Sequence, residues 1–259
     1  MPKFSANLSL LFTEHAFLDR FAAAARAGFT AVECQFPYAF DKHEIAARLR
    51  KHQLRMVLHN LPAGDWAAGD RGIACDAGRI DEFRHGVEQA IAYATTLDCP
   101  QLNCLAGIPP SGQADAVSRE TFVANLRYAA DALKAAGLRL LIEPINTRDI
   151  PGFYLHTSAQ ALALIDAVGS DALFLQYDIY HAQRMEGELA ATIAANLPHI
   201  GHMQLADNPG RHEPGSGEIN FAWLLPHIDA LGYTGWVGCE YHPAAGTEAG
   251  LRWLEAFRR

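Results

Sequence analysis

One junction recurs along this chain: a segment of helical period ends in a glycine, and a short apolar segment follows within a few residues. It occurs at Ala27-Gly28-Phe29, at Ala136-Gly137 and at Leu231-Gly232. Glycine just past a helix adopts the left-handed cap conformation that other residues resist, so each junction predicts a turn from a helix into a strand. Repetition of this unit predicts an α/β fold in which parallel strands alternate with helices.

Eight strands are expected, and each is followed by a segment of helical pattern. They are Phe4–Asn7, Ala31–Cys34, Arg55–His59, Gln101–Cys104, Arg139–Glu143, Leu173–Asp178, Ile200–Leu205 and Trp236–Glu240. Two helix starts carry the spacing of a capping box, Asp41 with Glu44 and Thr157 with Gln160. No charge run or low-complexity linker divides the chain. The sequence therefore predicts one (β/α)8 TIM barrel that spans residues 1–259 as a single domain.

Charge and composition exclude several classes of partner. The net charge is -8, which disfavours a nucleic-acid or anionic membrane surface, so a small anionic substrate needs locally placed cations. No apolar run reaches transmembrane length, and the N-terminal residues lack the pattern of a signal peptide. The five cysteines are odd in number and contain no C-x-x-C pair, which predicts neither disulfides nor structural zinc and favours a reducing cytoplasm. Whether the chain forms a homo-oligomer is left open.

Polar side chains end four successive predicted strands: Glu143, Asp178, Gln204 and Glu240. In a barrel of this kind the carboxyl ends of the strands converge on one mouth. Three carboxylates and an amide oxygen form a hard ligand set, which predicts a divalent cation, Mg²⁺ in preference to Mn²⁺. The competing interpretation is that these are ordinary solvent-facing polar residues, and Gln204 in particular suits a structural hydrogen bond equally well.

Glu143 and Glu240 are expected to face each other across the mouth, because two strands separate theirs. This geometry suits removal of a proton from one carbon and its delivery to the neighbouring carbon. His181, three residues after Asp178, and His59, at the end of the third strand, are candidate substrate-binding residues. Each is equally well explained as a packed structural histidine.

Two connections are long for this fold, Asn60 to Gly78 and Asn208 to Asn220. Loops of this length are usually functional or disordered, and the aromatic and charged residues of the first favour an ordered lid. The second contains Arg211, whose guanidinium is suited to bind a substrate carboxylate through two hydrogen bonds.

Long segments of the chain resemble one known family, the hydroxypyruvate isomerases and the closely similar 2-oxo-tetronate isomerases, within the xylose-isomerase-like barrels. The segments are Phe4–Ser9, Asn60–Gly69, Ile142–Asn146, Tyr177–Glu188, Gln204–Arg211 and Gly238–Tyr241. The resemblance implies a Mg²⁺-type ion on Glu143, Asp178, Gln204 and Glu240, with the two glutamates as the acid/base pair. It implies conversion of hydroxypyruvate to 2-hydroxy-3-oxopropanoate through an enediolate.

Two departures from the family concern the substrate: lysines common in the family are replaced here by Ile108 and His242. Loss of two cations near the mouth could weaken carboxylate binding or change the preferred acid. The alternatives are therefore a 2-oxo-tetronate isomerase or a ketose 3-epimerase using the same glutamates, although such epimerases usually show histidine at Gln204. A DNA-repair endonuclease would need more metal-binding histidines and a basic face. A barrel that only binds a metabolite would be expected to lack one of the glutamates, and both are present.

Overall fold

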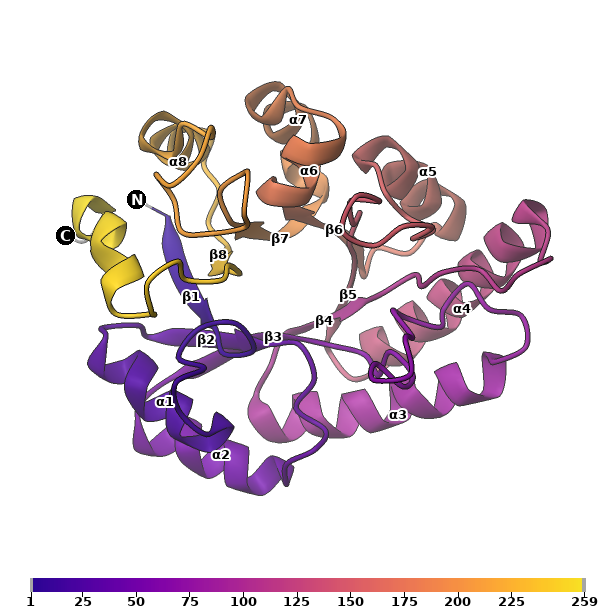
Figure 1. The fold of residues 1–259 in the computed structure, drawn as a ribbon. Coiled ribbons are helices and arrows are strands. Elements are labelled where there is room, and N and C mark those ends of the chain that lie inside the picture. Colours follow the sequence, from indigo (N-terminus) through magenta and orange to yellow (C-terminus); the bar gives the residue numbers. More distant parts are fainter. Residues whose placement is uncertain (1, 258–259) are drawn as a thin grey trace.

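All eight expected strands are present in a computed structural model that describes residues 2–257. They form a closed parallel barrel in the order of the sequence, with the helices outside it (Figure 1). The strands are β1 (Lys3–Asn7), β2 (Ala31–Cys34), β3 (Arg55–Asn60), β4 (Gln101–Cys104), β5 (Arg139–Ile142), β6 (Leu173–Asp178), β7 (Ile200–Leu205) and β8 (Trp236–Cys239). The predicted TIM barrel is thus confirmed.

The outer layer consists of α1 (Phe17–Arg26), α2 (Lys42–Lys51), α3 (Ile80–Leu97), α4 (Asp115–Ala135), α5 (Ser158–Val168), α6 (Ile179–Met185), α7 (Leu189–Asn196) and α8 (Phe221–Ala230), with 3₁₀ helices η1 (Leu197–His199) and η2 (Ala249–Phe257). The helix α4 shows how the sequence specifies the layer. Its fully buried Phe122, Leu126, Ala129 and Leu133 recur at helical spacing and form one apolar stripe.

The two predicted capping boxes are only half formed. The side chain of Asp41 accepts hydrogen bonds from the backbone N–H groups of His43 and Glu44, as an N-cap should. Thr157 likewise accepts from the N–H of Gln160. The side chain of Gln160, however, accepts from the N–H of His156 rather than of Thr157. The helix starts are therefore correct, and the reciprocal bond at α5 is displaced by one residue.

The long connection after β3 is packed between its neighbours. Trp66 contacts Phe36, in the loop after β2, with ring centroids 5.3 Å apart. On the other side Gly72, with φ of +114°, lies so close to the loop after β4 that a Cβ atom would be 2.5 Å from the carbonyl oxygen of Leu105. The connection therefore lies against both neighbouring loops at the carboxyl ends of the strands, and its role as a lid stays a prediction.

No helix in the described part of the chain is long and apolar enough to span a bilayer. The five cysteines are all buried and unpaired, as the lack of cysteine pairs in the sequence predicts. A cytoplasmic location stays a prediction.

Candidate active site

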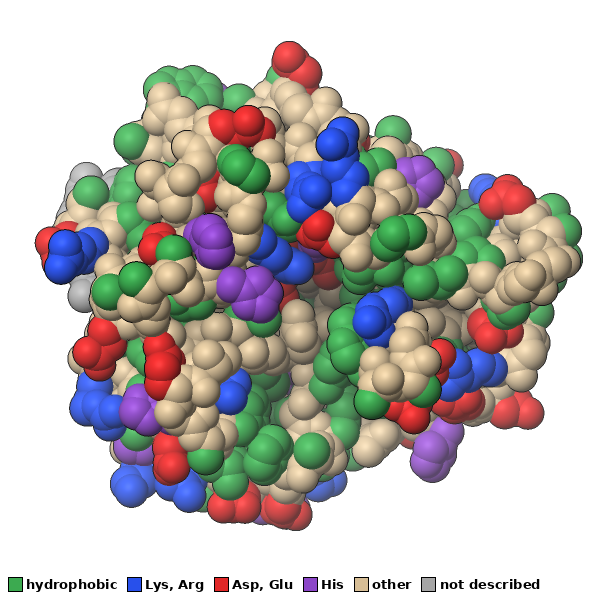
Figure 2. Space-filling view, viewed as in Figure 1, with side chains coloured by type: hydrophobic (Ala, Val, Ile, Leu, Met, Phe, Trp, Pro, Cys, Tyr) green, Lys and Arg blue, Asp and Glu red, His purple; other side chains and the backbone are tan. Residues whose placement is uncertain are grey.

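The carboxyl ends of β5, β6 and β8 bring three acidic side chains together. Glu143 and Glu240 each lie one residue beyond a strand, and Asp178 is the last residue of β6. One ligand atom from each, and one from His181 on α6, all lie within 4.8 Å of one another. All four side chains are buried. Figure 2 shows a hollow in the face viewed in Figure 1, with acidic side chains in its depth and basic ones at its rim.

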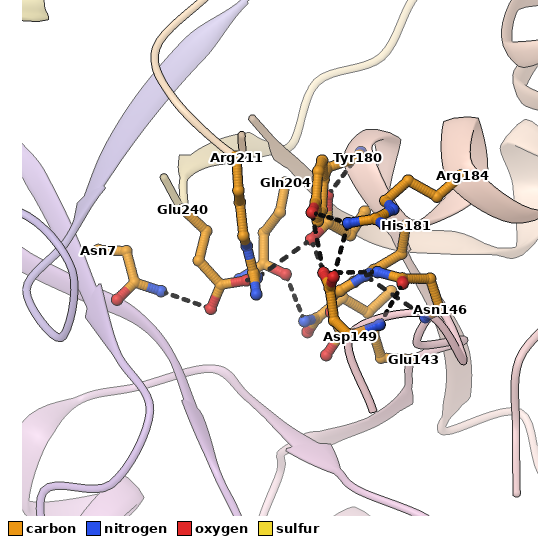
Figure 3. A network of polar contacts seen from close by, with 12 residues as sticks. Asn7, Glu143, Asn146, Asp149, Tyr180, His181, Arg184, Gln204, Arg211 and Glu240 are labelled. Atoms are coloured by element: carbon orange, nitrogen blue, oxygen red, sulfur yellow. Dashed lines mark hydrogen bonds and ion pairs between the residues drawn. The ribbon is translucent and has the colours of Figure 1, made fainter. Parts of the chain in front are cut away.

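The two glutamates are held differently, although they converge on the same space (Figure 3). Glu240 accepts hydrogen bonds from Asn7 (3.0 Å) and Gln35 (3.1 Å) at one oxygen and from Arg211 (2.7 Å) at the other. Glu143 accepts from the Asn103 amide at 2.8 Å. More donors, one of them cationic, thus stabilise the ionised form of Glu240.

Burial and mutual repulsion dominate the electrostatics of this cluster. Burial raises the pKa of Glu143 well above its ordinary value, and the charges of Glu240 and Asp178 raise it further. Burial also raises the pKa of Asp178 to about 7. The pKa of Glu240 is raised by burial too, but the charge of Arg211 opposes that rise. Three carboxylates in so small a volume favour either a bound proton or a bound cation.

His181 is fixed as a donor toward this cluster. The Asn146 oxygen accepts hydrogen bonds from the backbone N–H groups of Arg148 and Asp149, so its NH₂ group must face the other way. That NH₂ group donates to Nδ1 of His181 at 2.7 Å. Burial, together with the charge of Arg211, lowers the pKa of His181 well below its ordinary value. The ring is therefore neutral with its proton on Nε2, which lies 3.5 Å from Asp178.

Arg211 enters the site from the loop after β7. Its guanidinium lies 2.7 Å from Glu240, 3.8 Å from Asp178 and 5.2 Å from the centre of the Tyr180 ring. The backbone at Arg211 has φ of +56°, a left-handed conformation that costs a non-glycine residue roughly 1 kcal/mol and often marks functional positions. Its buried Nε has no hydrogen-bond partner. The predicted Arg211 therefore lies in the site and keeps a donor for a further ligand.

Gln204 lies level with Asp178 in the pairing of β6 with β7. Its oxygen accepts from Gln176 at 2.6 Å, and its NH₂ group donates to Glu33 at 2.8 Å. Metal binding by Gln204 stays a prediction, with its oxygen on the side away from Glu33.

The structure does not bring His59 into this cluster. Its Nδ1 lies 3.3 Å from the hydroxyl of Tyr38 and 3.1 Å from the carbonyl oxygen of Asn60, and burial lowers its pKa to about 4. The next side chain, Asn60, instead contacts Asn103 beside Glu143. Because successive strand residues face opposite sides, His59 faces the helices and Asn60 the barrel. A substrate contact for His59 therefore has no support in the structure.

The observed cluster fits a divalent cation. The Asp178 oxygen that faces His181 is buried without a hydrogen-bond partner. This acceptor oxygen has no donor of its own and lies beside two more carboxylates. Such an oxygen-rich environment is the kind that Mg²⁺ and Mn²⁺ prefer. Glu143, Asp178 and Glu240 could hold such an ion, with His181 at its edge.

Several residues of the site were not predicted from the sequence. They lie inside the barrel or next to it, and they are Asn7, Glu33, Gln35, Asn103, Asn146, Gln176 and His202. One signal was present: polar residues two apart within apolar strands, such as His202 with Gln204, share the face that points into the barrel.

Comparison with known proteins gives consistent results. Residues 21–257 match the family described as xylose isomerase-like TIM barrel. The hydroxypyruvate isomerase of Escherichia coli is 55% identical over 258 residues, covering 100% of both chains. The 2-oxo-tetronate isomerase of Cupriavidus necator is 47% identical and covers 99% of both. A crystal structure described as AP endonuclease, family 2 from Brucella melitensis has a TM-score of 0.97 at 46% identity, covering 100% of both chains.

Proposed function

We propose a substrate and a mechanism for this chain, which belongs to the xylose isomerase-like TIM barrel family and is an isomerase. The proposed reaction interconverts hydroxypyruvate and 2-hydroxy-3-oxopropanoate through an enediolate. The observation that carries the proposal is the convergence of Glu143 and Glu240 on one buried space beside Asp178 and His181. Two carboxylates in this arrangement suit transfer of a proton between adjacent carbons.

In the forward direction one glutamate removes a proton from C3, and the electron pair of the C–H bond forms the enediolate double bond. The other glutamate delivers a proton to C2, while the hydroxyl proton passes from the C3 oxygen to the C2 oxygen. The Nε2–H of His181 donates a hydrogen bond to a substrate oxygen, and Arg211 binds the substrate carboxylate through its unused Nε. A divalent cation held by Glu143, Asp178, Gln204 and Glu240 would stabilise the negative charge that develops on the substrate oxygens.

The unequal surroundings of the two glutamates assign their starting roles. Three side-chain donors, one of them Arg211, oppose the rise in the pKa of Glu240, whereas Glu143 has one neutral donor and a pKa raised well above its ordinary value. Glu240 therefore acts as the base that removes the C3 proton, and Glu143 delivers the proton to C2. The roles exchange in the reverse reaction.

The relatives support this class of substrate but include both three-carbon and four-carbon specificities. The closely similar four-carbon reaction, 2-oxo-tetronate isomerisation, needs the same glutamates and one more substrate carbon. A pocket distinguishes two substrates that differ by one methylene group by only about 1–3 kcal/mol. The endonuclease description of the Brucella protein is less well supported here, because the net charge is -8 and the candidate metal cluster has a single histidine.

The departures at Ile108 and His242 concern the rim of the same site. The backbone N–H of His242 donates to the carbonyl oxygen of Arg211, so the residue at 242 lies directly beside the proposed carboxylate-binding loop. Ile108 is 40% exposed in the loop after β4. With neither lysine present, Arg211 carries more of the carboxylate recognition.

The decisive experiment measures turnover of hydroxypyruvate and of 2-oxo-tetronate, with and without Mg²⁺ or Mn²⁺, for wild type, Glu143→Gln and Glu240→Gln. Both variants should lose at least ~100-fold in kcat. In D₂O, Glu143→Gln should still exchange the C3 proton of hydroxypyruvate, whereas Glu240→Gln should not. Full activity after removal of metal, or in either variant, would refute the mechanism, and turnover of a ketose alone would refute the substrate.

A further inference from the structure

A fourth acidic side chain, Glu33 of β2, lies inside the barrel next to the proposed metal site. It is fully buried, and its carboxylate accepts from Ser5 (2.8 Å), Asn7 (3.1 Å), His202 (2.9 Å) and Gln204 (2.8 Å). In each of these four contacts the Glu33 carboxylate oxygen is the acceptor. A buried carboxylate with this many donors is a built feature of the barrel.

The Glu33 carboxylate fits here because a neighbouring strand residue is a glycine and has no side chain. β1 and β8 lie between β2 and β7, so Glu33 must reach past β8 to meet Gln204. At that level β8 has Gly238, where a Cβ atom would lie 2.3 Å from the Glu33 carboxylate. Any larger residue at 238 would thus displace Glu33 from Gln204.

The pairing of Glu33 with Gln204 decides which end of the glutamine amide faces the site. An ionised carboxylate only accepts hydrogen bonds, so Gln204 must present its NH₂ group to Glu33. Its oxygen is thereby turned away from Glu33, to where Gln176 donates to it. A glutamine amide binds a hard cation through oxygen and cannot do so through NH₂.

We propose that Glu33 is a positioning residue that makes Gln204 an oxygen ligand for the divalent cation. This rests on the metal site of the proposed function. Glu33 itself touches neither metal nor substrate, and it acts by fixing the orientation of the Gln204 amide. Without the Glu33 carboxylate, only the hydrogen bond from Gln176 orients that amide, and outer-shell partners of this kind typically contribute ~10- to 100-fold to metal affinity.

The test is Mn²⁺ binding to metal-free protein, measured by electron paramagnetic resonance, alongside the unfolding temperature. Glu33→Gln should weaken Mn²⁺ binding ~10- to 100-fold, and Glu33→Asp, which keeps the charge but shortens the reach, should weaken it similarly. Ser5→Ala is the matched control, because it removes one hydrogen bond from the same carboxylate and leaves the Glu33–Gln204 pair intact. It should lower stability while leaving Mn²⁺ affinity within about threefold.

A double-mutant cycle separates this role from general stabilisation. If Glu33 acts through Gln204, then Glu33→Gln should cause little further loss of Mn²⁺ affinity in a Gln204→Met background. Wild-type affinity in a folded Glu33→Gln protein, or equal losses in Glu33→Gln and Ser5→Ala, would overturn the positioning role and leave the isomerase proposal standing. Failure of the wild type to bind Mn²⁺ would overturn the metal site and this role together.

Discussion

Asp178→Asn should stabilise the metal-free protein, and more so as the pH rises. Burial raises the pKa of Asp178 from 3.8 to about 7, so the folded protein binds this proton more tightly than the unfolded chain does. The contribution of Asp178 to stability is therefore greatest below about pH 4 and is lost as the pH rises to about 7. The difference between the two pKa values corresponds to ~4 kcal/mol in the free energy of unfolding.

Asparagine removes that titration and keeps the helix cap. The Asp178 oxygen that caps α6 by accepting from the N–H of Tyr180 has an equivalent in asparagine. For a chain of this length 1 kcal/mol corresponds to ~2 °C, so the variant should unfold ~8 °C above wild type at pH 8 in the presence of a chelator. At pH 4 the two should nearly coincide. The exposed Asp166→Asn on α5 is the matched control, with no such difference expected.

Calorimetry and urea unfolding between pH 4 and pH 8, with chelator or with excess Mn²⁺, measure the effect. Added Mn²⁺ should raise the unfolding temperature of wild type increasingly with pH, because the ion replaces the proton, and should raise that of Asp178→Asn far less. If Asp178→Asn is no more stable than wild type at pH 8 without metal, the buried charge of Asp178 does not destabilise the folded protein, and the reasoning is refuted.

Two further variants test the groups around the carboxylates. Asn146→Asp should place an acceptor against Nδ1 of His181, move the ring proton from Nε2 to Nδ1, and lower kcat/KM ~100-fold; unchanged ring signals in ¹⁵N NMR would contradict this. Arg211→Gln removes the charge that lowers the pKa of Glu240 and Glu143, so the acidic limb of the kcat/KM profile should move to higher pH. A limb that stays in place, or moves to lower pH, would argue against that coupling.

The residues at the strand ends could be predicted because their position depends only on the local amino-acid sequence. A carboxylate after a short apolar run, as at Glu143 and Glu240, reaches the mouth wherever a parallel barrel forms. The position of His59 outside the cluster has an equally local cause. The strand continues by one residue to Asn60, and because successive side chains alternate, Asn60 faces the barrel and His59 the helices. The apolar pattern of Arg55–His59 does not decide between these two faces.

The inner network could not be predicted, because it depends on closure of the barrel. Glu33 and Gln204 are 171 residues apart in the chain and meet only because β1 and β8 close the ring with a glycine at Gly238. A single acidic residue within Ala31–Cys34 is by itself indistinguishable from an exposed strand residue.

The charges of the site explain why the buried carboxylates, Arg211 and the proposed cation site occur together. Glu143, Asp178 and Glu240 share one buried space, and Arg211 is the cation in direct contact with two of them. The metal-free site therefore carries excess negative charge in a buried space, which is unfavourable for stability. A divalent cation relieves that excess, and the anionic acid then enters a site whose charge is more nearly balanced. The same imbalance that should make Asp178→Asn more stable than wild type is, on this reasoning, what gives the native site its affinity for the ion.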